Sequence, residues 1–146
     1  MYYYYYYKDF NDIHRAGLQF LHAAIDVLND VHPRMSVSTV QTLLYIAGSQ
    51  DPSVPSQINL TELGKQLQVP YSTLIRHIEI LGEGTPTKSG LNLVERVSIP
   101  GQRKEQYVRL SYKGVDLISE VKSTFEKYRS HQDHVPTSRN NLRLEE

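Results

Sequence analysis

The 146-residue chain contains no cysteine, and its positive and negative charges balance to a net charge of zero. The absence of cysteine excludes disulfides, zinc–thiolate sites and thiol redox sensing, and it fits a reducing cytoplasm. A net charge of zero excludes a general attraction to polyanions. The sequence lacks an apolar run of about 18 residues and a secretory signal, so it predicts no membrane-spanning helix and no export. We therefore expect a single-domain cytoplasmic protein with an ordinary hydrophobic core.

Catalytic and metal-binding motifs are missing as well. No serine, histidine and aspartate combination, phosphate-binding glycine loop or pair of carboxylates stands out, so the sequence predicts neither an enzyme nor a cofactor. His131 and His134 have a spacing that metal ligands can use, but they lie in a polar segment without a third ligand. We expect these two histidines to be solvated, and His14 and His22 to be packing or surface residues of a helix.

The charge is unevenly distributed along the chain. Residues 58–114 hold eight lysines and arginines and five acidic residues, whereas the segments on either side carry more acidic than basic residues. A mildly basic middle segment suits local contact with phosphates.

Within this basic segment, residues 60–82 predict two short helices joined by a tight turn. Asn59 can cap the first helix, residues 60–67, and Glu62 follows at the spacing of a capping box. Pro70 ends the first helical pattern because it has no N–H group. Gly64 is small enough to let the two helices approach closely, as a helix–turn–helix requires. Two amphipathic helices around a turn also occur in helical domains that bind no nucleic acid.

The second predicted helix, residues 71–81, is amphipathic. Its apolar stripe consists of Leu74, Ile78 and Leu81. The other side would be free to enter a groove of DNA, and it contains Tyr71, Ser72, Thr73, Arg76 and His77. The alternative for Arg76 is a solvated helix face with Glu79 as a neighbour. His77 can face either DNA or solvent.

A β-hairpin is predicted after these helices. Residues 91–99 and 106–110 have the composition of strands, and the Pro-Gly pair between them is a strong turn signal. Arg103 and Lys104 lie near the tip of this hairpin, where a cation can contact phosphates or the minor groove; the alternative is an exposed charged turn. The preceding segment, residues 83–90, has the composition of a polar loop.

Long amphipathic helices are predicted at both ends of the globular part. A first helix over residues 9–31 would be about 30 Å long, which exceeds what a small core needs, so part of its apolar face can meet a second subunit. A shorter helix follows at about residues 38–47, capped by Ser36 or Ser38. Ser111 can cap the last helix, residues 112–129. Outside these elements, residues 1–8 form a tyrosine-rich arm or an added tag, and residues 130–146 a mobile tail.

This order of elements resembles the MarR family of winged-helix regulators over about residues 10–128. The segments that carry the resemblance are residues 60–67, 71–81, 90–96 and 108–114. The resemblance implies a mainly α fold with a small β-hairpin, in a single domain at residues 9–129. It is a winged helix–turn–helix with its core at about residues 36–111 and long N- and C-terminal dimerisation helices at residues 9–31 and 112–129.

The resemblance also implies a function. It implies a sequence-specific transcriptional regulator, a repressor, that binds a palindromic operator in double-stranded DNA as a homodimer. Family members have a pocket for a small-molecule effector, but no residue here points to one. The candidate DNA-binding residues are Tyr71, Ser72, Thr73, Arg76, His77, Arg103 and Lys104, with Arg103 as the wing-tip arginine.

Three features depart from the family pattern. The wing has Pro100-Gly-Gln102 before Arg103, where the family usually carries an acidic residue. Gln68 occupies a turn position that is often glycine, and the loop at residues 83–90 is longer than usual. The rival interpretation is a winged-helix protein-interaction module, an antirepressor or assembly subunit, that does not bind DNA.

Overall fold

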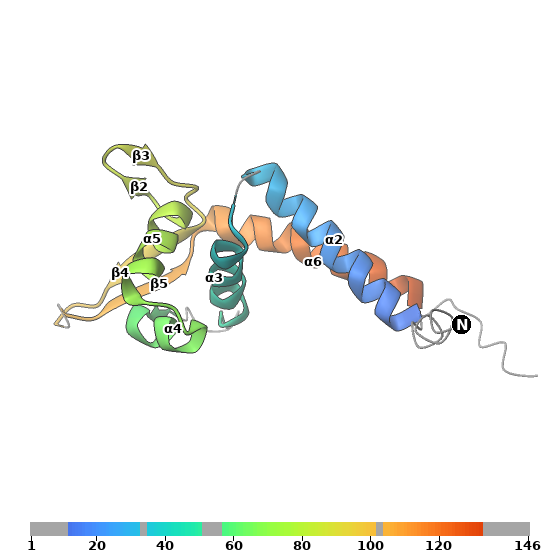
Figure 1. Cartoon of the computed structure of the whole chain (residues 1–146), viewed down its shortest axis with the longest axis horizontal. Coiled ribbons are helices and arrows are strands. Elements are labelled where there is room, and N and C mark those ends of the chain that lie inside the picture. Colours follow the sequence, from blue (N-terminus) through green and yellow to red (C-terminus); the bar gives the residue numbers. More distant parts are fainter. Residues whose placement is uncertain (1–11, 33–34, 51–56, 102–103, 133–146) are drawn as a thin grey trace, which may run out of the picture.

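The computed structural model contains a head of short helices and strands and an arm of two long helices (Figure 1). The predicted class, mainly helical with a small antiparallel sheet, is confirmed. None of the described helices is both long enough and apolar enough to cross a bilayer. The predictions for residues 1–8 and for the end of the tail fall outside the described residues. The structure describes residues 12–32, 35–50, 57–101 and 104–132.

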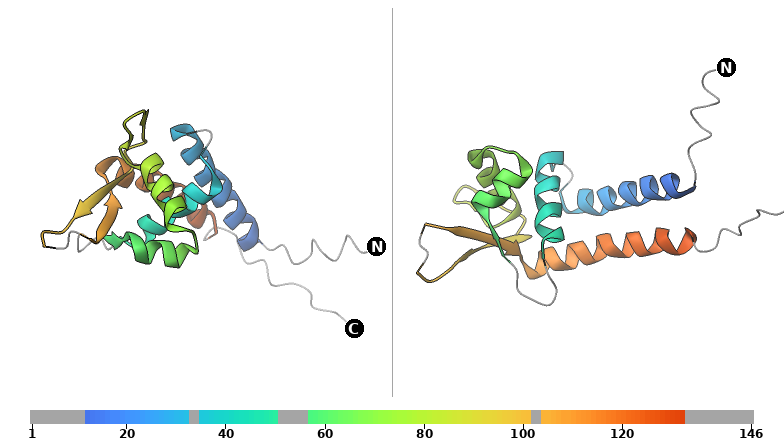
Figure 2. Two further views of the ribbon diagram at one scale, coloured as in Figure 1. Left: turned by 60° about the vertical axis from the view of Figure 1, so that its left-hand side comes forward. Right: turned by 90° about the horizontal axis from the view of Figure 1, so that it is seen from below.

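The arm consists of α2 (Asp12–Val31) and α6 (Tyr112–Gln132), which lie side by side (Figure 1 and the right view of Figure 2). Phe20 of α2 contacts Phe125 of α6 edge to face, with 5.2 Å between ring centroids. Helix α6 extends to Gln132, three residues past the approximate end predicted at residue 129, and neither proline nor glycine interrupts residues 129–132. The side chains buried in the arm are Ala24, Leu28, Leu117 and Val121.

Three shorter helices build the head, and two of them have the predicted caps. The head helices are α3 (Val37–Gly48), α4 (Leu60–Leu67) and α5 (Tyr71–Leu81). Ser36 Oγ accepts a hydrogen bond from the Thr39 N–H at 3.1 Å.

Asn59 caps α4, but the capping box is incomplete. Asn59 Oδ1 accepts from the N–H groups of Thr61 at 2.8 Å and Glu62 at 3.4 Å. The Glu62 carboxylate turns towards Gln66 instead, whose Nε2 donates to it at 3.0 Å. The cap prediction is therefore confirmed, and the reciprocal bond from Glu62 is not formed.

The turn between α4 and α5 is tight. Gln68 adopts the left-handed conformation, with φ 55° and ψ 41°, which costs a non-glycine residue roughly 1–2 kcal/mol. Gly64 is buried beneath Leu74, and a Cβ atom added to it would lie 3.4 Å from Leu74 Cδ2. The close approach of the two helices is thus confirmed, at a distance that an alanine would just accommodate.

The sheet has the strand order β1–β5–β4 and is antiparallel throughout. Its strands are β1 (Ile58–Asn59), β4 (Val94–Ser98) and β5 (Gln106–Leu110). The predicted strand at residues 91–99 is too long. Its first residues bond to the end of α5 instead, through Leu91 N to Ile80 O at 2.9 Å and Leu93 N to Leu81 O at 2.7 Å.

The segment at residues 83–90 is not the predicted irregular loop. It contains a second small hairpin, formed by β2 (Gly84–Thr85) and β3 (Lys88–Ser89). Gly84 has a φ of +92°, which a residue with a side chain rarely adopts, and this conformation lets the chain leave α5 directly into β2.

A single core joins the head helices to the sheet. Full burial of each aliphatic side chain stabilises the fold by roughly 1.5–3 kcal/mol, so this core fixes the rotation of α5 about its own axis. Its fully buried hydrophobic side chains are Leu43, Ile46, Leu60, Leu63, Leu74, Ile78, Leu81, Leu93 and Val108.

Candidate nucleic-acid interface

Helix α5 buries one face in the head and exposes the opposite one. Leu74, Ile78 and Leu81 are almost completely buried, as the apolar stripe predicted. The expected polar side is exposed at Tyr71, Ser72 and Arg76, and Thr73 is half-buried. The structure therefore brings four of the five predicted α5 residues to the outer surface, while their contact with DNA stays a prediction.

The prediction that His77 faces DNA or solvent is wrong. Its side chain is only 6% exposed, and Nδ1 lies 3.0 Å from Oγ1 of Thr42 on α3. Thr42 Oγ1 also lies 3.1 Å from the Ser38 carbonyl and can donate its single proton there. In the tautomer with a proton on Nδ1, His77 then donates to Thr42. His77 comes three residues after Leu74 and four before Leu81, and this helical spacing could have placed it inside.

The surroundings of His77 favour its neutral form. Burial of the ring, followed by the positive charge of the adjacent Arg76, lowers the pKa of His77 below the usual value for histidine. His77 is therefore a polar link between α3 and α5, and its neutral form is favoured next to the exposed Arg76 in the sequence.

The first turn of α5 has no side-chain cap. Pro70 occupies the capping position and makes no side-chain hydrogen bond to the helix. The first N–H groups of a helix have no partner within it, and they favour an anion at that end of the helix axis. Ser72 and Thr73 lie in this first turn, so their hydroxyl groups accompany these N–H groups.

The β4–β5 hairpin projects from the head next to α5 (Figures 1 and 2). Lys104 is exposed at its turn, whereas Arg103 lies outside the described residues, so the predicted wing-tip contact is untested. On one face of the hairpin, Arg109 Nε pairs with Glu95 Oε1 at 2.6 Å. That arginine is therefore largely neutralised by its partner across the strands.

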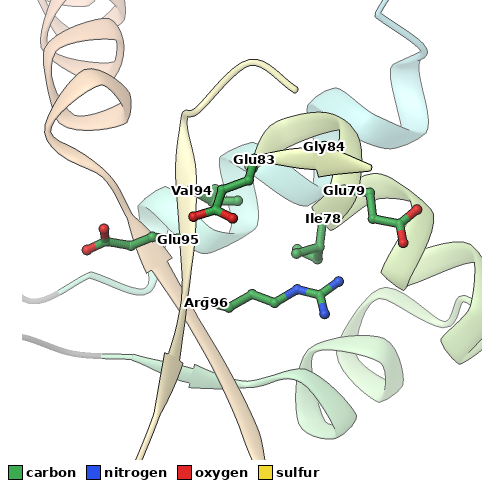
Figure 3. A pocket seen from close by; sticks show the side chains of 8 residues that line it. Ile78, Glu79, Glu83, Gly84, Val94, Glu95 and Arg96 are labelled. Carbon is green, nitrogen blue, oxygen red and sulfur yellow. The ribbon is translucent and has the colours of Figure 1, made fainter. Parts of the chain in front are cut away.

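A cleft of about 460 Å³ separates α5 from β4. Figure 3 shows the Arg96 side chain pointing from β4 towards α5, while Glu95 points to the other side of the strand. Ile78 and Val94 supply apolar lining, and Glu79 and Glu83 stand on the α5 side.

Arg96 is a candidate that sequence reasoning missed. It is exposed, and its Nη1 donates to Oε1 of the equally exposed Gln106 at 3.4 Å, which is a long hydrogen bond. Strand side chains alternate, so a buried Val94 places Arg96 on the same face, next to the helix. That alternation was the signal that could have identified it.

The described residues form no group of three or more metal-ligating side chains. The surface around α5 and the β4–β5 hairpin carries cations, hydroxyl groups and helix N–H groups, with Glu79 and Glu83 beside the cleft. Such a surface suits a polyanion with planar, hydrogen-bonding edges.

No protein-family model and no curated protein sequence matches the chain. Several solved structures do share its fold. A DNA complex of MepR from S. aureus aligns with a TM-score of 0.62 at 15% identity, covering 83% of this chain and 87% of that one. The transcriptional regulator Tm0710 from Thermotoga maritima aligns with a TM-score of 0.61 at 17% identity, covering 82% and 74%.

A transcriptional regulator of the MarR family from Rhodococcus sp. RHA1 aligns with a TM-score of 0.51 at 15% identity, covering 86% of this chain and 79% of that one. These similarities span both the head and the arm. The chain thus has the winged-helix fold of these MarR-type regulators, with β4–β5 as the wing and α5 as the second helix of the helix–turn–helix.

Proposed function

We propose that this chain is a sequence-specific, DNA-binding transcriptional regulator that acts as a homodimer on a palindromic operator. One observation carries the proposal. Helix α5 holds its apolar side in the core and presents Ser72 and Arg76 outward, beside the projecting β4–β5 hairpin. The MepR structure of the same fold is a complex with DNA, which supports this assignment.

Arg76 is the proposed reader of a base. Its exposed guanidinium can donate two parallel hydrogen bonds to the edge of a guanine, which discriminates against other bases by roughly 1–3 kcal/mol. Ser72 and Thr73, near the uncapped start of α5, are proposed to contact phosphates with Tyr71 beside them. Arg96, Lys104 and Arg103 would contribute salt-sensitive affinity that does not depend on sequence.

The arm supports the proposed dimer. Leu18, Leu21 and Ile25 follow one another on α2 at spacings of three and four residues, with exposures of 54%, 54% and 39%. These side chains lie beside the face of α2 that packs on α6, so the protomer leaves an apolar stripe uncovered. A second copy related by a twofold axis would cover the same stripe on both partners.

A symmetric pair presents two α5 helices to one face of the duplex. Their half-site centres would lie about 34 Å apart, or roughly ten base pairs. A dimer bound at a site that overlaps a promoter would exclude polymerase, so we propose a repressor.

Selection of bound duplexes from a random DNA pool tests the function. We expect a palindrome with half-sites about one helical turn apart. In Arg76→Ala, affinity for the selected site should fall by roughly 1–3 kcal/mol, and preference should relax at one position of each half-site.

The matched control removes a cation from the arm. Lys122→Ala, on the exposed side of α6, should leave both affinity and base preference unchanged. Failure of the wild-type protein to bind any duplex in a salt-dependent manner would contradict the proposed function.

The second candidate is a winged-helix protein-interaction module. It is favoured by Glu79 and Glu83, whose carboxylates lie at the C-terminal end of α5 next to the cleft and would repel phosphates. Under this proposal α5 is idle and the arm binds partners, so the wild-type protein would show no salt-dependent DNA binding while remaining folded.

A further inference from the structure

The β2–β3 hairpin has no evident role in the stability of the head. Figures 1 and 2 show that it projects from the head at the end of α5. Each residue from Thr85 to Ser89 is exposed, so the turn and both strand ends contribute nothing to the core. Ordering these residues opposes folding through lost backbone entropy, and buried apolar surface does not compensate for it.

The hairpin is nevertheless held firmly against α5. The backbone bonds Gly90 N to Glu83 O at 3.0 Å and Asn92 N to Gly82 O at 2.9 Å close its base. A Cβ atom on Gly90 would overlap the Gly82 carbonyl oxygen, and one on Gly84 would overlap the Lys88 carbonyl oxygen. The glycines at both ends thus permit backbone contacts that fix the direction of the hairpin relative to α5.

This fixed direction places the hairpin beside the exposed face of α5. A hollow of about 230 Å³ lies between them, with Arg76 on the helix side and Lys88 on the hairpin side. Ile80 supplies apolar lining, and Glu79 is the one carboxylate among the described lining residues. The hollow also includes hydroxyl groups of the hairpin, those of Thr85 and Ser89.

We propose that the β2–β3 hairpin is a second wing, which binds the DNA backbone through Lys88 and the hydroxyl groups of Thr85 and Ser89. This inference rests on the proposed function, and it adds a contact that the helix and the first wing do not make. Lysine and hydroxyl side chains at an exposed turn contact phosphates, which position a protein on DNA without selecting sequence. Glu79 offsets part of the local positive charge, so the hairpin adds one ionic contact and not a broad cationic surface.

The salt dependence of binding tests this proposal. Each phosphate neutralised on duplex DNA contributes about 0.9 to the slope of log affinity against log salt concentration. In the full-length Lys88→Ala protein, on a duplex selected by the wild type, we expect the slope to fall by about 0.9 with unchanged base preference. Lys88→Arg should restore the slope, because it keeps the charge.

A phosphate-ethylation interference experiment supplies a second readout. Ethylated phosphates that block wild-type binding should include positions that no longer interfere in Lys88→Ala, next to the half-site and separate from those lost in Lys104→Ala. The folding control is simple, since the Lys88 side chain is exposed. Circular dichroism and the melting temperature should therefore match the wild type.

Two different failures can be told apart. If the wild type binds DNA but Lys88→Ala keeps the same slope as Lys122→Ala, the second wing is overturned and the proposed function stands. If the wild type binds no duplex at any salt concentration, the proposed function fails and this inference fails with it.

Discussion

The contact of His77 with Thr42 joins α3 to the inner side of α5. In the tautomer protonated at Nδ1, His77 donates to a hydroxyl group that in turn donates to the backbone of its own helix, so both polar side chains have a hydrogen-bond partner while buried. Because Arg76 is adjacent and also disfavours the imidazolium, protonation opposes the packing of the head. The stability of the contact between α3 and α5 is therefore linked to pH.

This link predicts a loss of stability on acidification. In the unfolded chain His77 titrates near 6.5, and its folded pKa is lower, so the unfolded state binds more protons between the two values. The contribution of His77 is fully present above about pH 6.5 and is lost as the pH falls below it. We expect the free energy of unfolding, measured with urea at pH 7.5 and 5.5, to change less with pH in His77→Asn than in the wild type. Asparagine keeps a hydrogen-bond donor near the position of Nδ1. The other histidines are present in both proteins, so their contributions cancel in this comparison. An identical pH dependence of the two proteins would contradict the role of His77 in pH-dependent stability.

The burial of a residue could be predicted where the helical repeat alone determines which side of the helix it lies on. The stripe of Leu74, Ile78 and Leu81 is buried as predicted, and that rotation exposes Ser72 and Arg76. His77 was misplaced because its polarity was given more weight than its position beside that stripe. Lys88 was missed because nothing local in the sequence places it near α5. It lines a hollow with Arg76 only because the hairpin folds back beside that helix.

At the scale of elements, the end of α6 next to the wing depends on one serine. Ser111 Oγ accepts from the Gly114 N–H at 3.1 Å and donates to the Asn92 carbonyl at 2.5 Å. It thus caps α6 and joins that helix to the segment before β4. Asn92 has a positive φ of 55°, which asparagine tolerates better than most residues.

Ser111→Ala should lower the free energy of unfolding by about 1–2 kcal/mol, because it removes a helix cap and leaves the Asn92 carbonyl with one partner fewer. Urea denaturation at fixed protein concentration measures this change. The matched control is Ser119→Ala on the exposed side of α6, where Oγ bonds only to the Val115 carbonyl of its own helix, and the change should stay within about 0.5 kcal/mol. Equal effects of the two substitutions would show that Ser111 does not act as a cap.

The helices whose ends are marked by capping residues could be predicted from the sequence, and the β2–β3 hairpin, which has no such marker, could not. The starts of α4 and α6 follow from Asn59 and Ser111, whose side chains act within a few residues. Hairpin β2–β3 has two-residue strands and little β propensity, so its form depends on bonds to the end of α5. Such tertiary bonds leave no periodic trace in the sequence.

At the scale of the whole molecule, the arm extends away from the head and leaves an apolar stripe uncovered (Figure 2). The order of helices and strands could be predicted from amphipathic spacing and turn residues. The direction of the arm could not, because it depends on how α2 packs on α6 and on the edge-to-face contact of two phenylalanines.

If the uncovered stripe is a dimer interface, introducing a single charge into it should prevent dimerisation. Leu21→Asp places a carboxylate in the proposed interface without disturbing the side chains packed between α2 and α6, since Leu21 is 54% exposed. We expect this variant to sediment as a folded monomer at concentrations where the wild type is a dimer, because an unpaired buried charge opposes association. Gln19→Asp, also exposed on α2, should leave the dimer intact. A wild-type monomer, or a Leu21→Asp dimer of unchanged affinity, would contradict the proposed interface.

Helix α6 runs without interruption from the base of the wing to the far end of the arm. Adding or deleting one residue inside it would turn everything beyond that point by about 100° and shift it by about 1.5 Å. An added or deleted residue at the turn of Pro86 and Thr87 would not rotate or shift the rest of the chain in this way. Changes of chain length should therefore be tolerated at that turn and rejected within α6, whose length sets the distance from the wing to the far end of the arm.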